Sequence, residues 1–315
     1  MSGDRVLVTG GAGFIGVNLV RVLKRHGWDA IAFDNFTTGH RDDAEANGFD
    51  EIIEGDIRDR DALTRAMRDS EATKVVHLAA QAGVPTSIAD PFYDCELNVL
   101  GTLNALVAAR DAGVGSFVMA SSNAPLGEVE PPSSERVVPK PLSPYGASKL
   151  AGEAYCSAFA GSYGLATTAL RFANVYGPFS YHKGSVVAGY FKAVQEGRPL
   201  VIYGDGTQTR DFVFVEDLAE GIAGALTLPA GKNSTVHLGS GTETTVNDLA
   251  TFVLKTVGEP VEVVHEPARA GEVQRSCSDI SNAQRLFGFD PSTRLEDGLS
   301  RTWDWFVSRA ADQKV

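Results

Sequence analysis

A glycine-rich turn between a predicted strand and a predicted helix constrains the fold of this chain more than any other feature. Residues 5–9 form a short apolar run typical of a buried strand, and residues 17–23 have helical periodicity. Between them stand Gly10, Gly13 and Gly16. A phosphate-binding loop needs glycine at this spacing, because backbone N–H groups and a helix N-terminus can then approach a diphosphate. The pattern predicts a nucleotide-binding α/β fold.

An acidic residue closes the next predicted strand. The apolar run at residues 30–33 ends at Asp34. A carboxylate in this place accepts hydrogen bonds from the ribose hydroxyls of a dinucleotide and repels a 2′-phosphate. The glycine turn and Asp34 together therefore predict NAD rather than NADP as the cofactor. A tight turn with an unrelated surface aspartate is the alternative interpretation.

Strands and helices alternate along the first half of the chain. Apolar runs at 51–57, 74–80 and 116–122 predict strands, and the patterns at 59–67 and 95–112 predict helices. This alternation is typical of a doubly wound α/β fold, with a parallel sheet covered on both faces. Ligands bind at the carboxyl ends of such strands. The residues expected at those ends are Asp34, Asp56, Ala79, Ala80 and Ser122.

Composition limits the class of protein. The chain has 315 residues, 43% hydrophobic and 22% charged, enough for one large domain or two closely joined ones. A net charge of −12 argues against a nucleic-acid or anionic-membrane surface. No apolar run approaches the roughly 20 residues that span a bilayer, and no signal peptide precedes the first strand. Cys95, Cys156 and Cys277 are too scattered for a disulfide framework or a zinc site, so we expect a cytoplasmic protein without a metal.

Tyr145 and Lys149 are a candidate proton-transfer pair. They stand four residues apart, so in a helix their side chains project from the same face. A phenol has a pKa of about 10 and is a poor base at neutral pH, but a neighbouring cation favours the phenolate and lowers that pKa. A surface pair formed by chance is the alternative interpretation of this spacing alone.

The chain resembles extended short-chain dehydrogenases/reductases, and within them the NAD-dependent nucleotide-sugar epimerase and dehydratase family, with UDP-sugar 4-epimerases (UDP-glucose or UDP-glucuronate) as the most similar members. Its motifs occur from residue 6 to the end of the chain in the family's order and spacing. The motifs are residues 9–16, Asp34-Asn35, 55–57, 77–80, Asn98, Tyr145-x-x-x-Lys149 and 171–178.

This resemblance implies a Rossmann-type NAD-binding domain over residues 1–177, which carries the catalytic residues. A smaller, mixed α/β substrate lobe would follow over 178–315, with some segments returning to the first domain. The implied catalytic residues are Ser122, Tyr145 and Lys149. The implied cofactor-binding residues are Gly10, Gly13, Phe14, Ile15, Gly16, Asp34, Asn35, Asp56, Ile57, Leu78, Ala79, Ala80, Asn98, Ser121, Tyr145, Lys149 and Phe172.

The same resemblance implies a UDP-sugar substrate. Arg210 and Arg269 would bind the diphosphate, which suits the guanidinium fork because it matches two phosphate oxygens at once. A lone arginine is otherwise usually a solvated surface residue. The implied substrate-binding residues are Ser122, Asn174, Val187, Val201, Ile202, Tyr203, Gln208, Arg210, Arg269 and Glu272.

The residues after Ser122 discriminate between reactions of the family. A 4,6-dehydratase has an Asp-Glu pair directly after the catalytic hydroxyl, and the related decarboxylases have a nearby Glu; this chain has Asn123-Ala124, which cannot move a proton. We therefore expect a 4-epimerase that works through a transient 4-keto sugar. Pro125-Leu126 departs from the family's Val-Tyr and leaves the shape of the sugar site open. A dehydratase, decarboxylase or reductase, or a protein of this fold without enzymatic activity, remains an alternative.

The identity of the sugar stays open at this point. The small Ser276 stands where, by resemblance, a bulky residue would exclude N-acetyl sugars, and a UDP-N-acetylhexosamine 4-epimerase is an alternative. His182 and Lys183 are candidates to bind the carboxylate of a UDP-hexuronate, or are ordinary loop residues. The resemblance also implies a homodimer formed through helices around 97–112 and 145–163.

Overall fold

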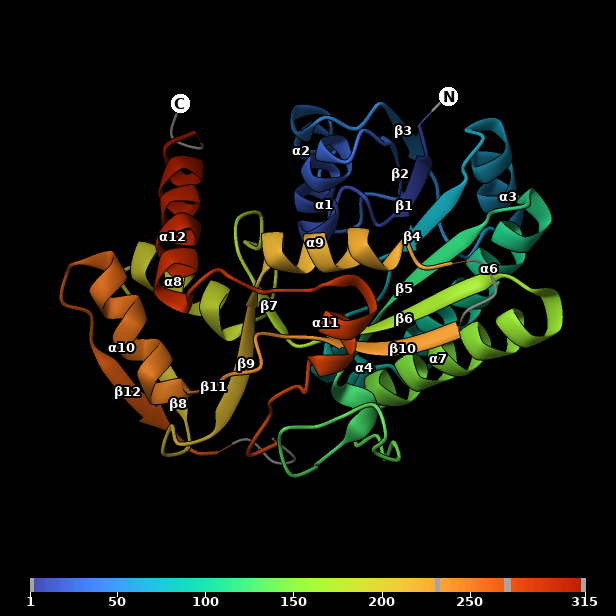
Figure 1. Ribbon diagram of the computed structural model, residues 1–315. Coiled ribbons are helices and arrows are strands. Elements are labelled where there is room, and N and C mark those ends of the chain that lie inside the picture. The colour runs from blue at the N-terminus through green and yellow to red at the C-terminus, as the bar shows by residue number, and fades with distance from the viewer. Residues whose placement is uncertain (1–2, 230–232, 269–272, 313–315) are drawn as a thin grey trace.

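A seven-stranded parallel sheet forms the centre of the computed structural model, which describes residues 3–229, 233–268 and 273–312 (Figure 1). The strand order is β10-β6-β5-β4-β1-β2-β3, and every neighbouring pair is parallel. The strands are β1 (Arg5–Thr9), β2 (Asp29–Asp34), β3 (Glu51–Glu54), β4 (Lys74–His77), β5 (Ser116–Ser122), β6 (Ala166–Phe172) and β10 (Asn233–Leu238). The strand order reverses between β1 and β4, which is where such sheets bind ligands. The predicted Rossmann-type α/β fold is confirmed.

Helices cover both faces of this sheet because its strands bury both of their faces. Val6 and Val8 of β1 pack into one core cluster, and Leu7 between them packs into another. The helices on the first face are α1 (Phe14–Arg25), α2 (Arg41–Asn47), α9 (Val215–Ala225) and α11 (Ser281–Phe287). Those on the second are α3 (Arg60–Asp69), α6 (Gly101–Ala112) and α7 (Pro144–Tyr163).

The helix predicted over 95–112 is interrupted. It consists of the end of α5 (Pro91–Cys95), a π-helical turn η1 (Glu96–Leu100) and α6, and the short α4 (Val84–Ala89) precedes it. The wide turn adds a residue to the helical period, and such turns are frequent at functional sites. Periodicity alone does not distinguish a π turn from an α turn, so the sequence did not indicate it.

A smaller body of mixed structure follows. The antiparallel pair β9 (Thr209–Phe214) and β11 (Glu243–Thr245) joins β7 (Asn174–Tyr176) in one sheet, and β8 (Leu200–Tyr203) pairs with β12 (Val263–Glu266). The helices α8 (Val186–Gln195), α10 (Val246–Val257) and α12 (Leu295–Asp312) enclose a third core cluster.

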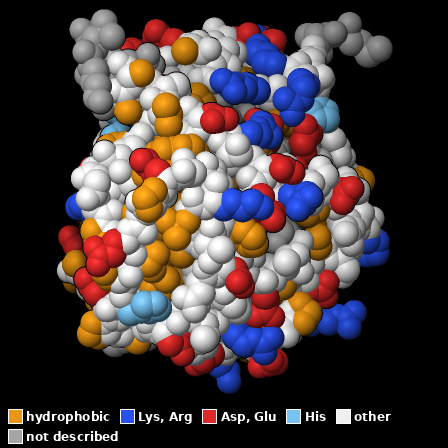
Figure 2. Space-filling view, turned by 90° about the vertical axis from the view of Figure 1, so that its left-hand side faces the viewer, with side chains coloured by type: hydrophobic (Ala, Val, Ile, Leu, Met, Phe, Trp, Pro, Cys, Tyr) orange, Lys and Arg blue, Asp and Glu red, His pale blue; other side chains and the backbone are white. Residues whose placement is uncertain are grey.

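The last helix, α12, has a packing role. Trp303 and Phe306 lie 5.3 and 5.5 Å, ring centre to ring centre, from Phe191 of α8. Hydrophobic side chains also reach the surface on the face over α10 and α12, between charged ones (Figure 2), and Val307 is among those exposed.

Two segments of the second half return to the large sheet. After β9 the chain forms α9, which packs against α1, and then β10, which lies beside β6 at the edge of the sheet. The division at residue 177 stays a prediction, and β7 just before it already pairs with β9. Within the described residues, no helix is both long and apolar enough to cross a bilayer.

A buried ion pair ties the helix α7 to the sheet. Glu153 accepts hydrogen bonds from Arg171 of β6 at 2.9 and 2.7 Å and from Ser121 of β5 at 2.6 Å. His237 of β10 lies opposite Arg171 in the register. Its two ring nitrogens have no hydrogen-bond partner within the described part of the chain. Burial and the nearby arginine lower the pKa of His237 to about 4.

This histidine makes stability depend on pH. A histidine in the unfolded chain has a pKa of about 6.5, so on acidification the unfolded chain binds the proton before the folded protein does. The folded protein therefore loses stability as the pH falls from about 6.5 to about 4. His237→Leu removes the titrating group. Between pH 7 and pH 5, we expect wild type to lose about 2 kcal/mol more of its free energy of unfolding than the variant. Urea denaturation at both pH values measures this, and equal losses would contradict the assignment.

Candidate active site

The glycine turn after β1 exposes its backbone at Gly10 and Gly13, and we call this turn the cradle. Gly10 has a φ of +69°, and its N–H donates to the carbonyl of Phe33 at 2.8 Å. A Cβ at this position would lie 2.7 Å from the backbone nitrogen of Ala79, so the close approach requires glycine. The helix α1 begins after Gly13, and the residues of its first turn (14–17) are uncharged. The first N–H groups of α1 are therefore suited to a diphosphate.

Asp34 is tied to this turn. Its carboxylate accepts hydrogen bonds from the backbone N–H of Ala12 at 3.0 Å and of Phe36 at 2.8 Å. Burial raises the pKa of Asp34, although these two N–H groups oppose the shift. Next to it, Asn35 donates to Asp56 at 3.0 Å, and the side chain of Arg58 holds the pKa of Asp56 well below its usual range. The residues predicted to bind the adenosine end thus lie together.

The helix α7, which carries the predicted catalytic residues Tyr145 and Lys149, starts at a defined cap. Ser143 accepts a hydrogen bond from the N–H of Gly146 at 3.1 Å, and proline occupies the first helical position. One turn separates Tyr145 from Lys149, whose Nζ lies 5.9 Å from the centre of the phenol ring. Lys149 is buried and donates to the carbonyl of Ala120 in β5 at 3.0 Å. The helix therefore presents both side chains at the carboxyl end of β5.

Burial dominates the electrostatics of this pair. It raises the pKa of Tyr145 to about 12, and the neighbouring Ser122 hydroxyl lowers that pKa only in part. It also lowers the pKa of Lys149 to about 8, against the opposing effect of Asp94 and Glu153. The expected lowering of this pKa by a neighbouring cation stays a prediction for the site with its cofactor. In the protein alone, desolvation of the phenolate is the largest influence on the pKa of Tyr145.

The residues predicted to bind UDP are spread over the smaller body. Arg210 donates from one Nη to the carbonyls of Thr209 and Val273, both at 2.8 Å. Gln208 donates to the carbonyl of Tyr203 at 2.7 Å. Ile202 is only 2% exposed, so a nucleobase would meet its backbone rather than its side chain, whereas Val201 and Tyr203 on the other face of β8 are half-buried. Asn174 is exposed and Val187 buried, and Arg269 and Glu272 lie outside the described residues.

Some predicted cofactor contacts are engaged within the protein. Ser121 bonds to Glu153, and Phe172 lies in the core. The amide of Asn98 donates to the carbonyl of Gln81 and to Asp94, both at 2.9 Å. Phe14, Ile15, Leu78, Ala79 and Ala80 are half-buried near the glycine turn, and Ile57 is buried. The cofactor roles of Ser121, Phe172 and Asn98 stay predictions, and their side chains are already satisfied or buried.

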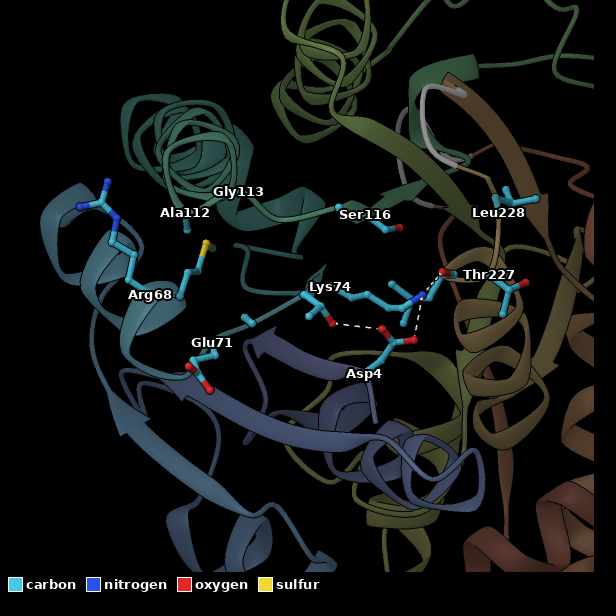
Figure 3. Close-up of a pocket in the computed structure, with 14 residues that line it drawn as sticks. Asp4, Arg68, Glu71, Lys74, Ala112, Gly113, Ser116, Thr227 and Leu228 are labelled. Atoms are coloured by element: carbon cyan, nitrogen blue, oxygen red, sulfur yellow. Dashed lines mark hydrogen bonds and ion pairs between the residues drawn. The ribbon is translucent and has the colours of Figure 1, made fainter. Parts of the chain in front are cut away.

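A cavity of about 700 Å³ lies at the opposite, amino-terminal edge of the sheet (Figure 3). Its lining includes Asp4, Lys74 and Ser116, which stand before or at the start of β1, β4 and β5. Lys74 pairs with Asp4 at 3.3 Å and donates to the carbonyl of Leu226 at 2.7 Å. None of the predicted site residues that the structure describes lines this cavity. In the described residues, no group of three or more His, Cys, Asp or Glu side chains is arranged to hold a metal ion.

Comparison with known proteins decides the family. Residues 6–239 match the model of the NAD dependent epimerase/dehydratase family. The chain is 38% identical over 304 residues to a putative UDP-glucose 4-epimerase of Methanocaldococcus jannaschii, which covers 95% of this chain and 97% of that protein. It is also 31% identical to a UDP-glucuronate 4-epimerase of Thermodesulfobacterium geofontis, over 95% of each chain. The crystal structure of UDP-glucose 4-epimerase from Thermus thermophilus in complex with NAD superimposes with a TM-score of 0.88 and 37% identity, covering 96% of this chain and 99% of that one.

The chain belongs to the NAD dependent epimerase/dehydratase family. The predicted NAD cofactor is confirmed with it. The geometry fits this cofactor: without a Cβ, Gly10 lets the turn approach the backbone of Ala79, and the first turn of α1 carries no acidic side chain that would repel a diphosphate. In this chain the diphosphate would be held by Gly10, Gly13 and the N-terminus of α1. The adenosine ribose would be held by Asp34 with Asn35.

Sequence reasoning missed two buried residues of the hydrogen-bond network that reaches the helix of the predicted catalytic pair. Gln81 and Asp94 are both buried, and they bond to each other at 2.9 Å. A signal was present, because Asp94 stands four residues before Asn98 and thus on the same helical face. Its significance required the position of η1 against α7, which sequence does not show.

Replacement of Gly10 tests the cradle. Gly10→Ala places a methyl group against Ala79 and imposes a left-handed backbone that costs an L-residue roughly 1–2 kcal/mol. We expect the purified variant to retain much less NAD than wild type, measured as nucleotide released on denaturation. Gly189→Ala in α8 is the matched control, because its Cβ meets open space; it should retain NAD fully and gain up to about 1 kcal/mol of stability. Wild-type NAD content in Gly10→Ala would refute the cradle.

Proposed function

We propose that this protein is an NAD-dependent epimerase that inverts C4 of a UDP-hexose through a transient 4-keto intermediate. The observation that carries the proposal is the constellation at the end of β5. Ser122, Tyr145 and Lys149 lie together there, while Asn123-Ala124 fill the positions where a dehydratase needs acidic residues. Such a site can remove and return a proton at one oxygen, and the two positions after Ser122 offer no acid to expel water.

Each residue has a defined task in this reaction. Ser122 would hold the O4 hydroxyl, and Tyr145 would take its proton as general base and return it to the epimer. Lys149, fixed by its bond to the Ala120 carbonyl, would stabilise the phenolate. Bound NAD would supply the redox chemistry at C4, and its positively charged ring would favour the phenolate of Tyr145.

The substrate would be held through UDP rather than through its sugar. Arg210, held by two backbone carbonyls, and Arg269 would bind the diphosphate, and the half-buried side of β8 would receive the uracil. The sugar needs few contacts of its own, because it must present both faces to the cofactor during one turnover.

UDP-glucose/UDP-galactose and UDP-glucuronate/UDP-galacturonate are the proposed substrate pairs. Relatives named for both sugars match along almost the whole chain. The structure favours the neutral hexose, because Lys183 donates to the carbonyl of Val175 at 2.7 Å and His182 contacts His40 at 2.9 Å. Both candidate partners of a carboxylate are thus engaged by the protein. The small Ser276 keeps UDP-N-acetylhexosamines as a second candidate.

We also propose a homodimer in the cytoplasm. Ile88, Phe92 and Leu100 are 64%, 83% and 51% exposed along α4, α5 and η1, which pack beside α7. Large apolar side chains grouped in this way are typical of an interface, and static light scattering measures the mass directly. The free cysteines Cys95, Cys156 and Cys277 support this location, because disulfides are rare in the reducing cytosol.

The phenol should be indispensable for turnover and not for binding. Tyr145→Phe removes the hydroxyl, and we expect kcat to fall at least about 100-fold, with UDP affinity by calorimetry near that of wild type. Tyr163→Phe, at the exposed end of the same helix, should leave both values unchanged. An equal loss of turnover and UDP binding in Tyr145→Phe would count against its assigned role.

The substrate is identified by NMR of the reaction mixture. UDP-glucose, UDP-galactose, UDP-glucuronate and UDP-N-acetylglucosamine are each incubated with the enzyme without added NAD. A C4 epimer should accumulate from at least one of them. A product that has lost water or CO2, or NADH formed in proportion to substrate, would instead indicate a dehydratase, a decarboxylase or a dehydrogenase.

A further inference from the structure

Asp94 is a buried carboxylate that the proposed reaction does not use. It lies on α5, only 1% exposed. Its Oδ1 accepts hydrogen bonds from the amides of Gln81 and Asn98, both at 2.9 Å. A side chain that only accepts hydrogen bonds is suited to the ionised form of the acid. Burying such a charge costs several kcal/mol unless something compensates it.

The hydrogen bonds of Asp94 connect the cofactor side of the site to the catalytic helix. Gln81 directly follows the Leu78–Ala80 segment after β4, and its backbone N–H and carbonyl both bond to the Asn98 side chain at 2.9 Å. The same Asn98 amide donates to Ser148 of α7 at 3.2 Å, and Ser148 donates to the Tyr145 carbonyl at 3.0 Å. The π turn η1 carries Asn98 into the centre of this network.

These hydrogen bonds do not by themselves explain why residue 94 is charged. Gln81 and Asn98 donate from neutral amides, which the carbonyl oxygen of an asparagine would accept equally well. Through Asn98, the network of Asp94 reaches Ser148, the residue before Lys149. The carboxylate charge favours the Lys149 ammonium and disfavours the Tyr145 phenolate.

The other ionisable groups around Lys149 are already accounted for. Glu153 acts on Lys149 from the same helix, but it is paired with Arg171 of β6. His77 of β4 is neutral near pH 7, because burial and the charge of Lys149 lower its pKa to about 3. On β10, burial likewise keeps His237 neutral. α4 contains no ionisable side chain. Asp94 is thus the carboxylate available to balance the Lys149 ammonium.

We propose that Asp94 is a positioning residue of the epimerase: its carboxylate clamps the segment after β4 to the catalytic helix through Gln81 and Asn98, and balances the charge of the Lys149 ammonium beside Tyr145. This assignment rests on the proposed function, because it gives Tyr145 and Lys149 their catalytic roles. It adds a carboxylate, contributed by a different helix, to the machinery that sets the pH range of the reaction.

Asp94→Asn removes the charge of this side chain and keeps its shape. The asparagine carbonyl retains both hydrogen bonds, while the negative charge disappears. That charge disfavours the phenolate and favours the ammonium, so its loss lowers the pKa of Tyr145 and of Lys149 alike. We expect both the acidic and the alkaline limb of the kcat–pH profile to move to lower pH. Ultraviolet tyrosinate absorbance of the NAD-loaded protein, with the Tyr145→Phe background subtracted, should show the same shift without turnover.

The matched control is Asp90→Asn, which removes an exposed carboxylate at the N-cap of the same helix α5. Its profile should coincide with that of wild type. A uniform fall in kcat in Asp94→Asn with both limbs unmoved would overturn the proposal and leave a purely structural role. If Asp94→Asn does not fold, Asp94→Ser, which leaves room for a water molecule between Gln81 and Asn98, provides the same readout.

The two proposals fail in different ways. If Tyr145→Phe remains active, the proposed function is wrong. If Tyr145→Phe is inactive and the limbs of Asp94→Asn do not move, the epimerase proposal stands and only the role of Asp94 is refuted.

Discussion

The site depends on the burial of the Lys149 ammonium beside Tyr145, where the carbonyl of Ala120 accepts its hydrogen bond. A lysine taken out of water loses much of its affinity for a proton, and burial lowers the pKa of Lys149 to about 8. The carbonyl of Ala120 accepts its hydrogen bond, and the charges of Asp94 on α5 and Glu153 on α7 oppose the fall of its pKa. The end of β5 and the helices α5 and α7 thus all act on one charge.

Backbone contacts fix the parts of the site proposed to bind the cofactor and the diphosphate, whereas the sugar of the proposed substrate must be free to move. The cradle at Gly10 and the bonds of Asp34 to Ala12 and Phe36 are made by backbone atoms, so they hold the cofactor site in one geometry. Arg210, for which we propose a role at the diphosphate, is similarly held by two backbone carbonyls. In the proposed reaction, a sugar anchored only through UDP would be free to turn, as inversion at C4 requires.

Sequence predicted the parts of this structure that repeat a short local pattern. The strand and glycine turn at residues 5–16, the acid at Asp34, and the Tyr145–Lys149 spacing each depend on a few adjacent residues. The family assignment and the NAD cofactor followed from them and are confirmed. The parallel order of the strands followed from their alternation with helices.

The features that sequence did not predict arise from distant contacts and from burial. In the protein alone, burial raises the pKa of Tyr145 to about 12, and sequence did not indicate this because the depth of a side chain is a property of the folded chain. The π turn and the Gln81–Asp94 bond join segments whose approach depends on how α5 packs against α7. Sequence also did not show that Lys183 donates a hydrogen bond to the carbonyl of Val175, because this contact depends on where the folded chain places the two residues.

The most direct test of the central claim follows an isotope at the reacting carbon. UDP-glucose deuterated at C4 is incubated with the purified protein in ordinary water without added NAD, and the products are examined by NMR. If the buried Tyr145–Lys149 pair works over a resident cofactor, UDP-galactose should form with the deuterium still at C4. Loss of the deuterium to the solvent, or its transfer to free nucleotide in place of an inverted sugar, would contradict the account.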